Sequence, residues 1–305
     1  MTLDEIETIN AATRTKLALA KLPGAAPLDA VPYYGYADVV CPDGPRLVLY
    51  TNNDSPVVAG MMTGGFEPMS LKLWARLCRT ATGILDIGAN VGIFSLCAAC
   101  LRPDLQVHAF EPNPYAYARL RMHKHLNGLM NIVEHQAAIG PDNGMTGMGW
   151  AIKPGGNISS GGGFGNYTQT DSHKYQWEKM LVQVVKLDGS GIAQTLGARP
   201  LVKIDVEGGE IIVVAAMKEV IALRPDILIE TFEADFCAAY DERLRSLGYR
   251  VYKINEPAGA LVPQERLVPC SPGDRTGFNQ FLSVRDRKST RLNSSHLGIS
   301  YAVFC

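Results

Sequence analysis

The chain has 305 residues, of which 47% are hydrophobic and 19% are charged, and its formal net charge at pH 7 is −1. This balance provides neither the basic excess of a nucleic-acid-binding protein nor a strongly acidic tail. The length and apolar content are sufficient for one large α/β core with a smaller lobe.

Residues 1–22 have the pattern of an amphipathic helix, because charged residues interrupt every apolar run. They do not resemble a secretory signal, and we find no run of the roughly 20 apolar residues that a membrane helix needs. The chain has seven cysteines, and the close pair, Cys97 and Cys100, lies in an apolar segment that is typical of a core helix. We therefore expect reduced thiols and a cytoplasmic protein without a membrane partner.

The N-terminal part of the chain is predicted to form a cap. Residues 31–50 predict short strands separated by a Pro-Asp-Gly-Pro turn, and residues 67–79 have helical periodicity. We therefore divide the chain into a helix and cap strands over 1–66 and a larger domain over 67–286. Glu67 could reach a bound ligand, although a solvated acid near a helix N-terminus is the commoner arrangement.

The most informative stretch is 84–95, whose sequence ILDIGANVGIFS predicts a buried strand, a glycine turn and the start of a helix. Gly88 and Gly92 lack a Cβ, so the chain can turn sharply and a ligand can lie against the backbone. The next strand, over 106–110, ends at Glu111, where a carboxylate can accept hydrogen bonds from ribose hydroxyls. This layout indicates a nucleoside-binding α/β domain.

The details of the turn favour S-adenosylmethionine over a dinucleotide. In a G-x-G-x-x-G pattern starting at Gly88, Asn90 and Ile93 occupy the positions where a pyrophosphate site needs glycine. Asp86 would attract the ammonium group of S-adenosylmethionine and repel a pyrophosphate. An NAD(P)-dependent oxidoreductase and a ligand-free glycine turn remain as alternatives.

The alternation of helix and strand continues after this turn. Residues 114–126 predict a helix and residues 131–139 a third strand, near whose end Gln136 and Ala137 could contact an adenine edge. We therefore expect the cofactor to be held at three neighbouring strand ends. The expected cofactor-binding residues are Asp86, Gly88, Asn90, Gly92, Glu111, Gln136 and Ala137.

Residues 141–181 interrupt this pattern. They are rich in glycine, asparagine, serine and threonine, a composition that predicts a long flexible insertion. Long loops at a ligand-binding edge are often lids, and a plain surface loop is the equally weighted alternative.

A second group of charged residues lies in 201–209, LVKIDVEGG. If the segment is a strand, Lys203, Asp205 and Glu207 lie on one face of it, because strand side chains alternate. Three ionisable groups on an apolar central strand are costly unless they pair with each other or serve a ligand. The alternative is a Lys203–Asp205 ion pair that only orders the strand end.

Four motifs together resemble the FkbM-type methyltransferases, which use S-adenosylmethionine. They are DIGANVG at 86–92, FEPNP at 110–114, LNG at 126–128 and KIDVEG at 203–208, and the resemblance covers roughly residues 60–285. The combination is more specific than any one motif. The glycine-rich insertion has no counterpart that we recognise in the family.

The resemblance implies a doubly wound, Rossmann-like α/β sheet of seven strands, the last of them antiparallel and lying over 278–285, with the cap added at the N-terminus. It also implies O-methylation of a hydroxyl on a sugar or other small natural product. A non-catalytic nucleoside-binding domain is the alternative, although such a domain would not require both Asp205 and Glu207.

Methyl transfer to a hydroxyl needs the acceptor oxygen to be aligned and its proton removed. Asp205 is the first candidate for this role, Glu207 is an alternative base or substrate clamp, and Lys203 could position either acid or the substrate. We assign no metal, although Asp205 and Glu207 could instead hold a divalent cation together with Glu230.

Residues 287–305 resemble the translation of a sequencing-library adapter. We therefore exclude them from the fold and assign no role to His296 or Cys305. The expected partners are a small hydroxyl acceptor and no nucleic acid, and the sequence does not indicate an oligomeric state.

Overall fold

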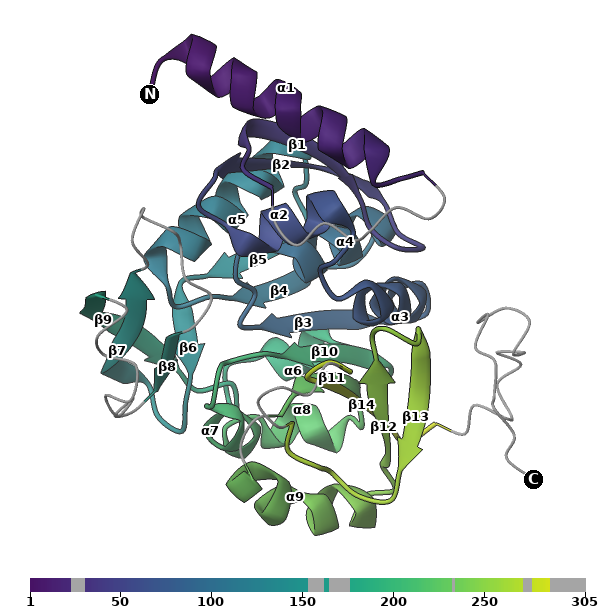
Figure 1. Cartoon of the computed structure of the whole chain (residues 1–305). Helices are drawn as coiled ribbons and strands as arrows, with labels where there is room; N and C mark the ends of the chain where they lie inside the picture. Colours follow the sequence, from purple (N-terminus) through teal and green to yellow (C-terminus); the bar gives the residue numbers. More distant parts are fainter. Residues whose placement is uncertain (23–30, 153–161, 165–175, 232–233, 271–275, 286–305) are drawn as a thin grey trace, which may run out of the picture.

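The structure is a computed structural model (Figure 1). It describes residues 1–22, 31–152, 162–164, 176–231, 234–270 and 276–285. The helices of these residues are α1 (Leu3–Leu19), α2 (Pro56–Thr63), α3 (Pro68–Cys78), α4 (Ile93–Leu101), α5 (Pro114–Leu126), α6 (Ile192–Thr195), α7 (Glu210–Ala215), α8 (Lys218–Ala222) and α9 (Ala234–Ser246).

The strands form three sheets. In chain order they are β1 (Tyr34–Val40), β2 (Arg46–Asn52), β3 (Gly83–Ile87), β4 (Val107–Phe110), β5 (Ile132–His135), β6 (Ala137–Ile139), β7 (Gly144–Ile152), β8 (Gly162–Phe164), β9 (Gln176–Val185), β10 (Pro200–Ile204), β11 (Asp226–Glu230), β12 (Arg250–Asn255), β13 (Ala260–Gln264) and β14 (Asn279–Ser283).

The main sheet has the strand order β13-β12-β14-β11-β10-β3-β4-β5. The strands from β11 to β5 pair in parallel, whereas β14 runs antiparallel to both of its neighbours. This topology confirms the Rossmann-like α/β fold and the antiparallel last strand. The sheet has one strand more than expected, because β13 pairs with the edge of β12.

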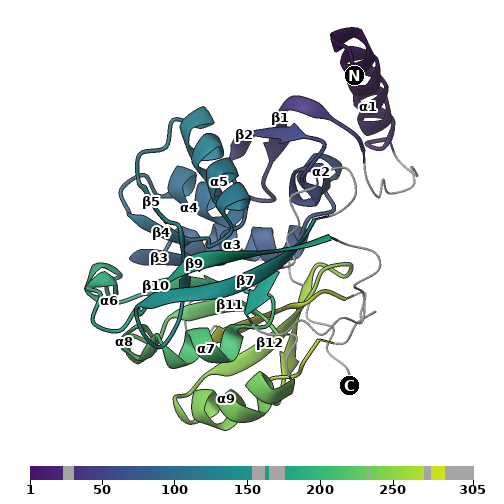
Figure 2. The same cartoon turned by 90° about the vertical axis from the view of Figure 1, so that its left-hand side faces the viewer.

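Helices cover both faces of the main sheet. Figure 2 shows α3, α4 and α5 with the cap on one side and α6 to α9 on the other. Each face has its own hydrophobic cluster: Ile84 belongs to the first and its neighbour Leu85 to the second. All residues of β3, β10 and β11 are buried. Most of their residues are apolar, as expected for a parallel sheet covered on both faces, and the charged exceptions include Asp86, Lys203 and Glu230.

The cap is joined to the main domain by polar contacts as well as by packing. The side chain of Asn10 in α1 donates to the carbonyl of Tyr34 at 2.7 Å and accepts from its N–H at 3.0 Å. Asn127, which follows α5, makes the same pair of contacts with the backbone of Val48 in β2, both at 2.8 Å. The division at residue 66 stays a prediction, since cap and domain share one hydrophobic cluster.

Two segments next to the main sheet differ from what the sequence predicts. The strand expected over 131–139 breaks at Gln136, so that β5 ends the main sheet and β6 begins a separate sheet of order β6-β9-β7-β8. The described parts of 141–181 belong mainly to that small sheet, in which β7 pairs with β9 from Gly144 to Ile152. The continuous ladder of hydrogen bonds between β7 and β9 outweighs the low strand propensity of glycine. Composition alone therefore predicts too much flexibility for this segment.

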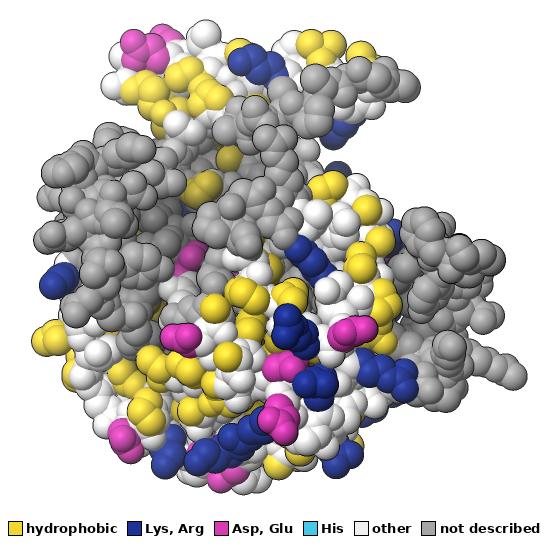
Figure 3. Space-filling view, turned by 60° about the horizontal axis from the view of Figure 1, so that its bottom comes forward, with side chains coloured by type: hydrophobic (Ala, Val, Ile, Leu, Met, Phe, Trp, Pro, Cys, Tyr) yellow, Lys and Arg dark blue, Asp and Glu magenta, His cyan; other side chains and the backbone are white. Residues whose placement is uncertain are grey.

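The surface shows no single dominant charge in the view of Figure 3, where basic and acidic side chains lie close together among hydrophobic ones. Within the described residues, no helix has the length and apolarity to cross a bilayer. The predicted adapter-derived segment, 287–305, lies outside the described residues.

Candidate functional site

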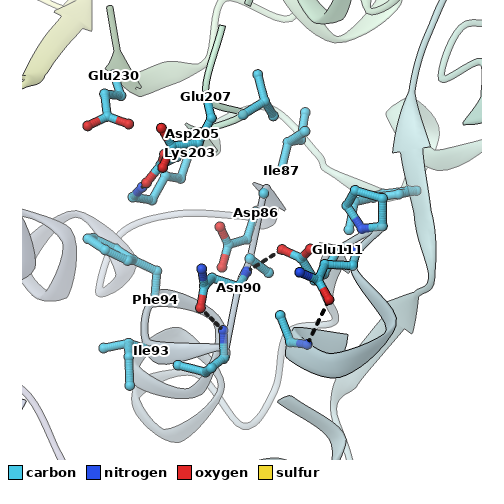
Figure 4. Close-up of a pocket in the computed structure, with 18 of the residues that line it drawn as sticks. Asp86, Ile87, Asn90, Ile93, Phe94, Glu111, Lys203, Asp205, Glu207 and Glu230 are labelled. Atoms are coloured by element: carbon cyan, nitrogen blue, oxygen red, sulfur yellow. Dashed lines mark hydrogen bonds and ion pairs between the residues drawn. The ribbon is translucent and has the colours of Figure 1, made fainter. Parts of the chain in front are cut away.

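A cavity of about 220 Å³ opens at the carboxyl ends of β3, β4, β10 and β11 (Figure 4). The order of the sheet reverses between β3 and β10, and such a switch point is where open α/β sheets bind ligands. The cap contributes Val57 and Phe66 to the wall, the start of α3 contributes Glu67, and the small sheet contributes Met148. The cavity therefore lies where all parts of the described fold meet.

The glycine turn after β3 is shaped by neighbouring protein groups. A Cβ on Gly88, whose φ is +82°, would lie 1.7 Å from the carbonyl oxygen of Asp205. A Cβ on Gly92, at φ +94°, would lie 3.0 Å from Leu120. Gly88 thus lines the cavity, as expected, and is also needed for close packing, whereas Gly92 is not among the lining residues. Contact of either glycine with a ligand stays a prediction.

Glu111 holds this turn in place. Its two carboxylate oxygens accept hydrogen bonds from the backbone N–H groups of Asn90, at 2.7 Å, and Asn113, at 2.8 Å. Burial raises the pKa of Glu111 to about 7, against the opposing effect of these two N–H donors. Asn90 itself adopts a left-handed φ of 51°. The strand end and the turn thus form one preorganised wall of the cavity.

Asp86, at the centre of this region, is fully buried. Its Oδ2 accepts a hydrogen bond from the Ser95 hydroxyl at 2.6 Å, whereas Oδ1 has no hydrogen-bond partner. Burial raises the pKa of Asp86 to about 6, although Lys203 and Ser95 oppose this shift. A buried acceptor without a partner costs about 1–3 kcal/mol, so this oxygen is a position where a donor group of a ligand would be favoured.

The structure separates the last two expected cofactor residues. Ala137 is buried and lines the cavity. Gln136 is exposed and lines a different hollow, formed with β7 and β9. The break between β5 and β6 falls at this residue, which explains why adjacent positions face different spaces.

Lys203, Asp205 and Glu207 all line the cavity, but a single strand does not align them. β10 ends at Ile204, and Glu207 has a left-handed φ of 54°. Lys203 Nζ lies 2.5 Å from Asp205 Oδ2 and 4.5 Å from the centre of the Phe94 ring. Burial lowers the pKa of Lys203, but the charges of Asp205 and Glu67 outweigh this effect and raise it.

Two further acids complete this end of the cavity. Glu230, at the end of β11, has a carboxylate oxygen within 4.8 Å of those of Asp205 and Glu207. Glu67, which sequence reasoning placed in solvent as the commoner arrangement, lines the cavity and accepts a hydrogen bond from Asn279 Nδ2 at 2.8 Å. Its φ of 39° is left-handed, which no residue pattern in the sequence reveals.

The pKa values of these acids differ according to their neighbours. Burial raises the pKa of Glu207 to about 7, and the charge of Asp205 adds to the shift. Burial and Asp205 likewise raise the pKa of Glu230. Burial opposes ionisation of Asp205 too, but Lys203 and a hydrogen bond from Glu230 lower its pKa. Oxygens of Asp205, Glu207 and Glu230 could ligate a divalent cation, although the Lys203 ammonium group beside Asp205 would repel it.

A family model described as the methyltransferase FkbM domain matches residues 86–251, which is more than half of the chain. The chain belongs to the FkbM methyltransferase family. The matched residues include the glycine turn, Glu111 and the acids at 205, 207 and 230, but not Glu67, and the match confirms the resemblance seen in the sequence motifs. It leaves α1, β1 and β2 of the cap outside the matched region.

Two curated relatives are similar in sequence to part of this FkbM-family chain. The 31-O-demethyl-FK506 methyltransferase FkbM of Streptomyces tacrolimicus is 29% identical over 157 residues, covering 45% of this chain and 59% of the relative. Methyltransferase 1 of Beauveria bassiana (strain ARSEF 2860) is 24% identical over 145 residues, covering 45% and 58%. The match thus spans less than two thirds of the length of either relative.

Solved structures are similar only at a low level. Methyltransferase FkbM from Methylobacillus flagellatus KT is 14% identical, with a TM-score of 0.38 and coverage of 66% of this chain and 43% of that one. M. jannaschii TYW2 in complex with AdoMet is 14% identical, with a TM-score of 0.39 and coverage of 82% and 84%. The fold assignment therefore rests on the strand order of the main sheet.

Proposed function

We propose that this chain binds S-adenosylmethionine in the cavity and catalyses transfer of its methyl group to a hydroxyl oxygen of a sugar or other small natural product. The observation that carries the proposal is the buried, unpartnered Oδ1 of Asp86, beside the glycine turn and between two different sets of acids. In Figure 4, Asn90 and Glu111 lie at one end of the cavity, and Lys203, Asp205, Glu207 and Glu230 lie at the other.

The first end fits the nucleoside and amino-acid parts of the cofactor. Each Glu111 oxygen already accepts one backbone hydrogen bond and has a second lone pair for a ribose hydroxyl. Asp86 Oδ1 can accept from an ammonium group, and the charge of Asp86 attracts it. The apolar side chains of Phe110 and Ala137 offer a surface for the adenine ring. When bound, S-adenosylmethionine supplies an electrophilic methyl group on a sulfonium.

The second end fits the acceptor. A general base works best when its pKa is near the working pH, and the pKa of Glu207 is about 7. Asp205 is a weaker base, because its ion pair with Lys203 stabilises the carboxylate. We therefore assign proton removal to Glu207 and positioning of the acceptor to Asp205 and Lys203, which reverses the order of the two acids expected from the sequence.

The backbone of Glu207 supports this assignment. A left-handed conformation costs a non-glycine residue roughly 1–2 kcal/mol, and Glu207 adopts it while lining the cavity. Such strain is typical of functional sites, where the surrounding structure holds a side chain in a working position.

Calorimetric titration of the full chain with S-adenosylhomocysteine, NAD and NADP tests the cofactor assignment. We expect binding of S-adenosylhomocysteine alone, weakened at least tenfold in Glu111→Gln and unchanged in Glu242→Gln, an exposed residue of α9. A thermal melt of each variant separates lost binding from lost folding. Binding of NAD or NADP, or of none of the three compounds, would contradict the proposal.

A further inference from the structure

The charges around the cavity are strongly unequal. Among the described lining residues, carboxyl groups belong to Glu67, Asp86, Glu111, Asp205, Glu207 and Glu230. Lys203 provides the one cationic side chain in that set. Because Asp86 and Glu111 belong to the proposed cofactor end, the acceptor end has four carboxyl groups around a single ammonium group.

The positive charge of Lys203 is already engaged. Nζ is 2.5 Å from Asp205 Oδ2, it lies over the Phe94 ring, and the side chain is 2% exposed. The nearby charge of Glu67 also stabilises the ammonium form. An incoming anion would therefore have to replace Asp205 as the partner of Lys203, at the cost of a buried ion pair.

Glu67 and Glu207 keep anions out through their charge, whereas Glu230, which donates a hydrogen bond to Asp205 and is therefore protonated, offers hydrogen-bonding groups without a charge. Glu67 comes from the start of α3, Glu207 from the loop after β10 and Glu230 from the end of β11, so they surround Lys203 from separate elements. Carboxylate oxygens accept hydrogen bonds, and the adjacent hydroxyls of a polyol are donors that can bridge two of them.

We propose that the methyl acceptor is a polyol without an anionic group, and that the acids around Lys203 select against phosphorylated and carboxylated acceptors. This inference rests on the proposed methyltransferase function and adds the charge of the substrate. A unit negative charge about 5 Å from one ionised carboxylate, at an effective dielectric constant near 20, weakens binding on the order of 100-fold.

The test compares glucose with glucuronate, which share a ring but differ by one carboxylate. Binding of each sugar to the full chain saturated with S-adenosylhomocysteine is measured by saturation-transfer NMR at about pH 8 and pH 6. We expect glucose to bind at least tenfold more tightly at the higher pH. The difference should narrow at the lower pH, because the pKa of Glu207 is about 7 and protonation removes its charge.

Variants identify the source of the selectivity. Glu67→Gln and Glu207→Gln should each bring the affinity for glucuronate closer to that for glucose at about pH 8, whereas Glu242→Gln, with the same loss of charge on exposed α9, should not. Equal or tighter binding of glucuronate to the unmodified chain, or binding of neither sugar, overturns the inference. Titration of S-adenosylhomocysteine in the same samples separates this outcome from failure of the proposed function, which would abolish that binding too.

Discussion

The two ends of the cavity are built on different principles. The cofactor end is shaped mainly by backbone contacts. Glu111 fixes the turn by accepting hydrogen bonds from two backbone N–H groups, and Gly88 lets the ends of β3 and β10 approach closely. At the acceptor end, side-chain charges from separate segments face one another around Lys203. The cofactor end therefore depends on backbone shape, and a substitution there acts by destabilising the fold. The acceptor end depends on charge, which both substitution and pH can change.

We expect the largest effect from a substitution that disrupts the backbone packing at the cofactor end. Gly88→Ala would place a Cβ 1.7 Å from the Asp205 carbonyl oxygen, in a left-handed conformation that alanine disfavours. We expect a loss of at least about 3 kcal/mol in the free energy of unfolding and loss of S-adenosylhomocysteine binding. Denaturant unfolding measures the first and calorimetry the second. The control is Gly147→Ala, where an added Cβ meets open space; equal stability of the two variants would contradict the packing argument.

The next largest effect is expected from a substitution at the acceptor end that leaves the cofactor end unchanged. Glu207→Gln removes the proposed base and should lower kcat by at least 10²-fold, while the affinity for S-adenosylhomocysteine changes little. Single-turnover methyl transfer to an accepted polyol measures the rate, and Glu242→Gln serves as the control on exposed α9. A kcat within threefold of the unmodified chain would exclude Glu207 as the base.

Asp86, at the cofactor end, is fully buried and has no partner at Oδ1, so its substitution separates stability from ligand binding. Its raised pKa means that burial of the ionised carboxylate destabilises the ligand-free fold near neutral pH. Asp86→Asn should therefore stabilise that fold by about 1–3 kcal/mol and weaken S-adenosylmethionine binding about tenfold. Differential scanning calorimetry with and without the ligand measures both, with exposed Asp38→Asn as the control. Parallel losses of stability and affinity would refute this account.

The smallest effect is a dependence of stability on pH. Glu111 and Glu207 have a pKa of about 7 in the folded chain, raised from the ordinary value of 4.5. The folded state therefore binds more protons than the unfolded state between these values, and the stabilisation is lost as pH rises through about 7. We expect the Tm of the ligand-free chain to fall by a few degrees from about pH 5 to pH 8. A Tm that rises over this range would contradict the raised pKa values.

Local sequence patterns predict the cofactor end better than the acceptor end. The helix expected over 114–126 has the observed bounds, and a helix starts within 84–95 as expected, because apolar periodicity and a glycine or proline start are local signals. The place of Glu67 at the cavity depends on contacts between distant segments, which no window of sequence contains, whereas Glu230 is expected beside Asp205 and Glu207. The break in the strand at Gln136 also depends on a distant segment, since β6 pairs with β9 and not with the main sheet.

The contact between Gly88 and Asp205 also limits how this chain can be redesigned. The carbonyl of Asp205 occupies the space that any side chain at position 88 would need, so the loop that carries Asp205 and Glu207 rests directly on the glycine turn. A loop transplanted from another methyltransferase to change the acceptor must reproduce this backbone path. The two segments therefore form a single cassette, and acceptor preference can be altered most safely through Glu67 and Glu230, which lie outside it.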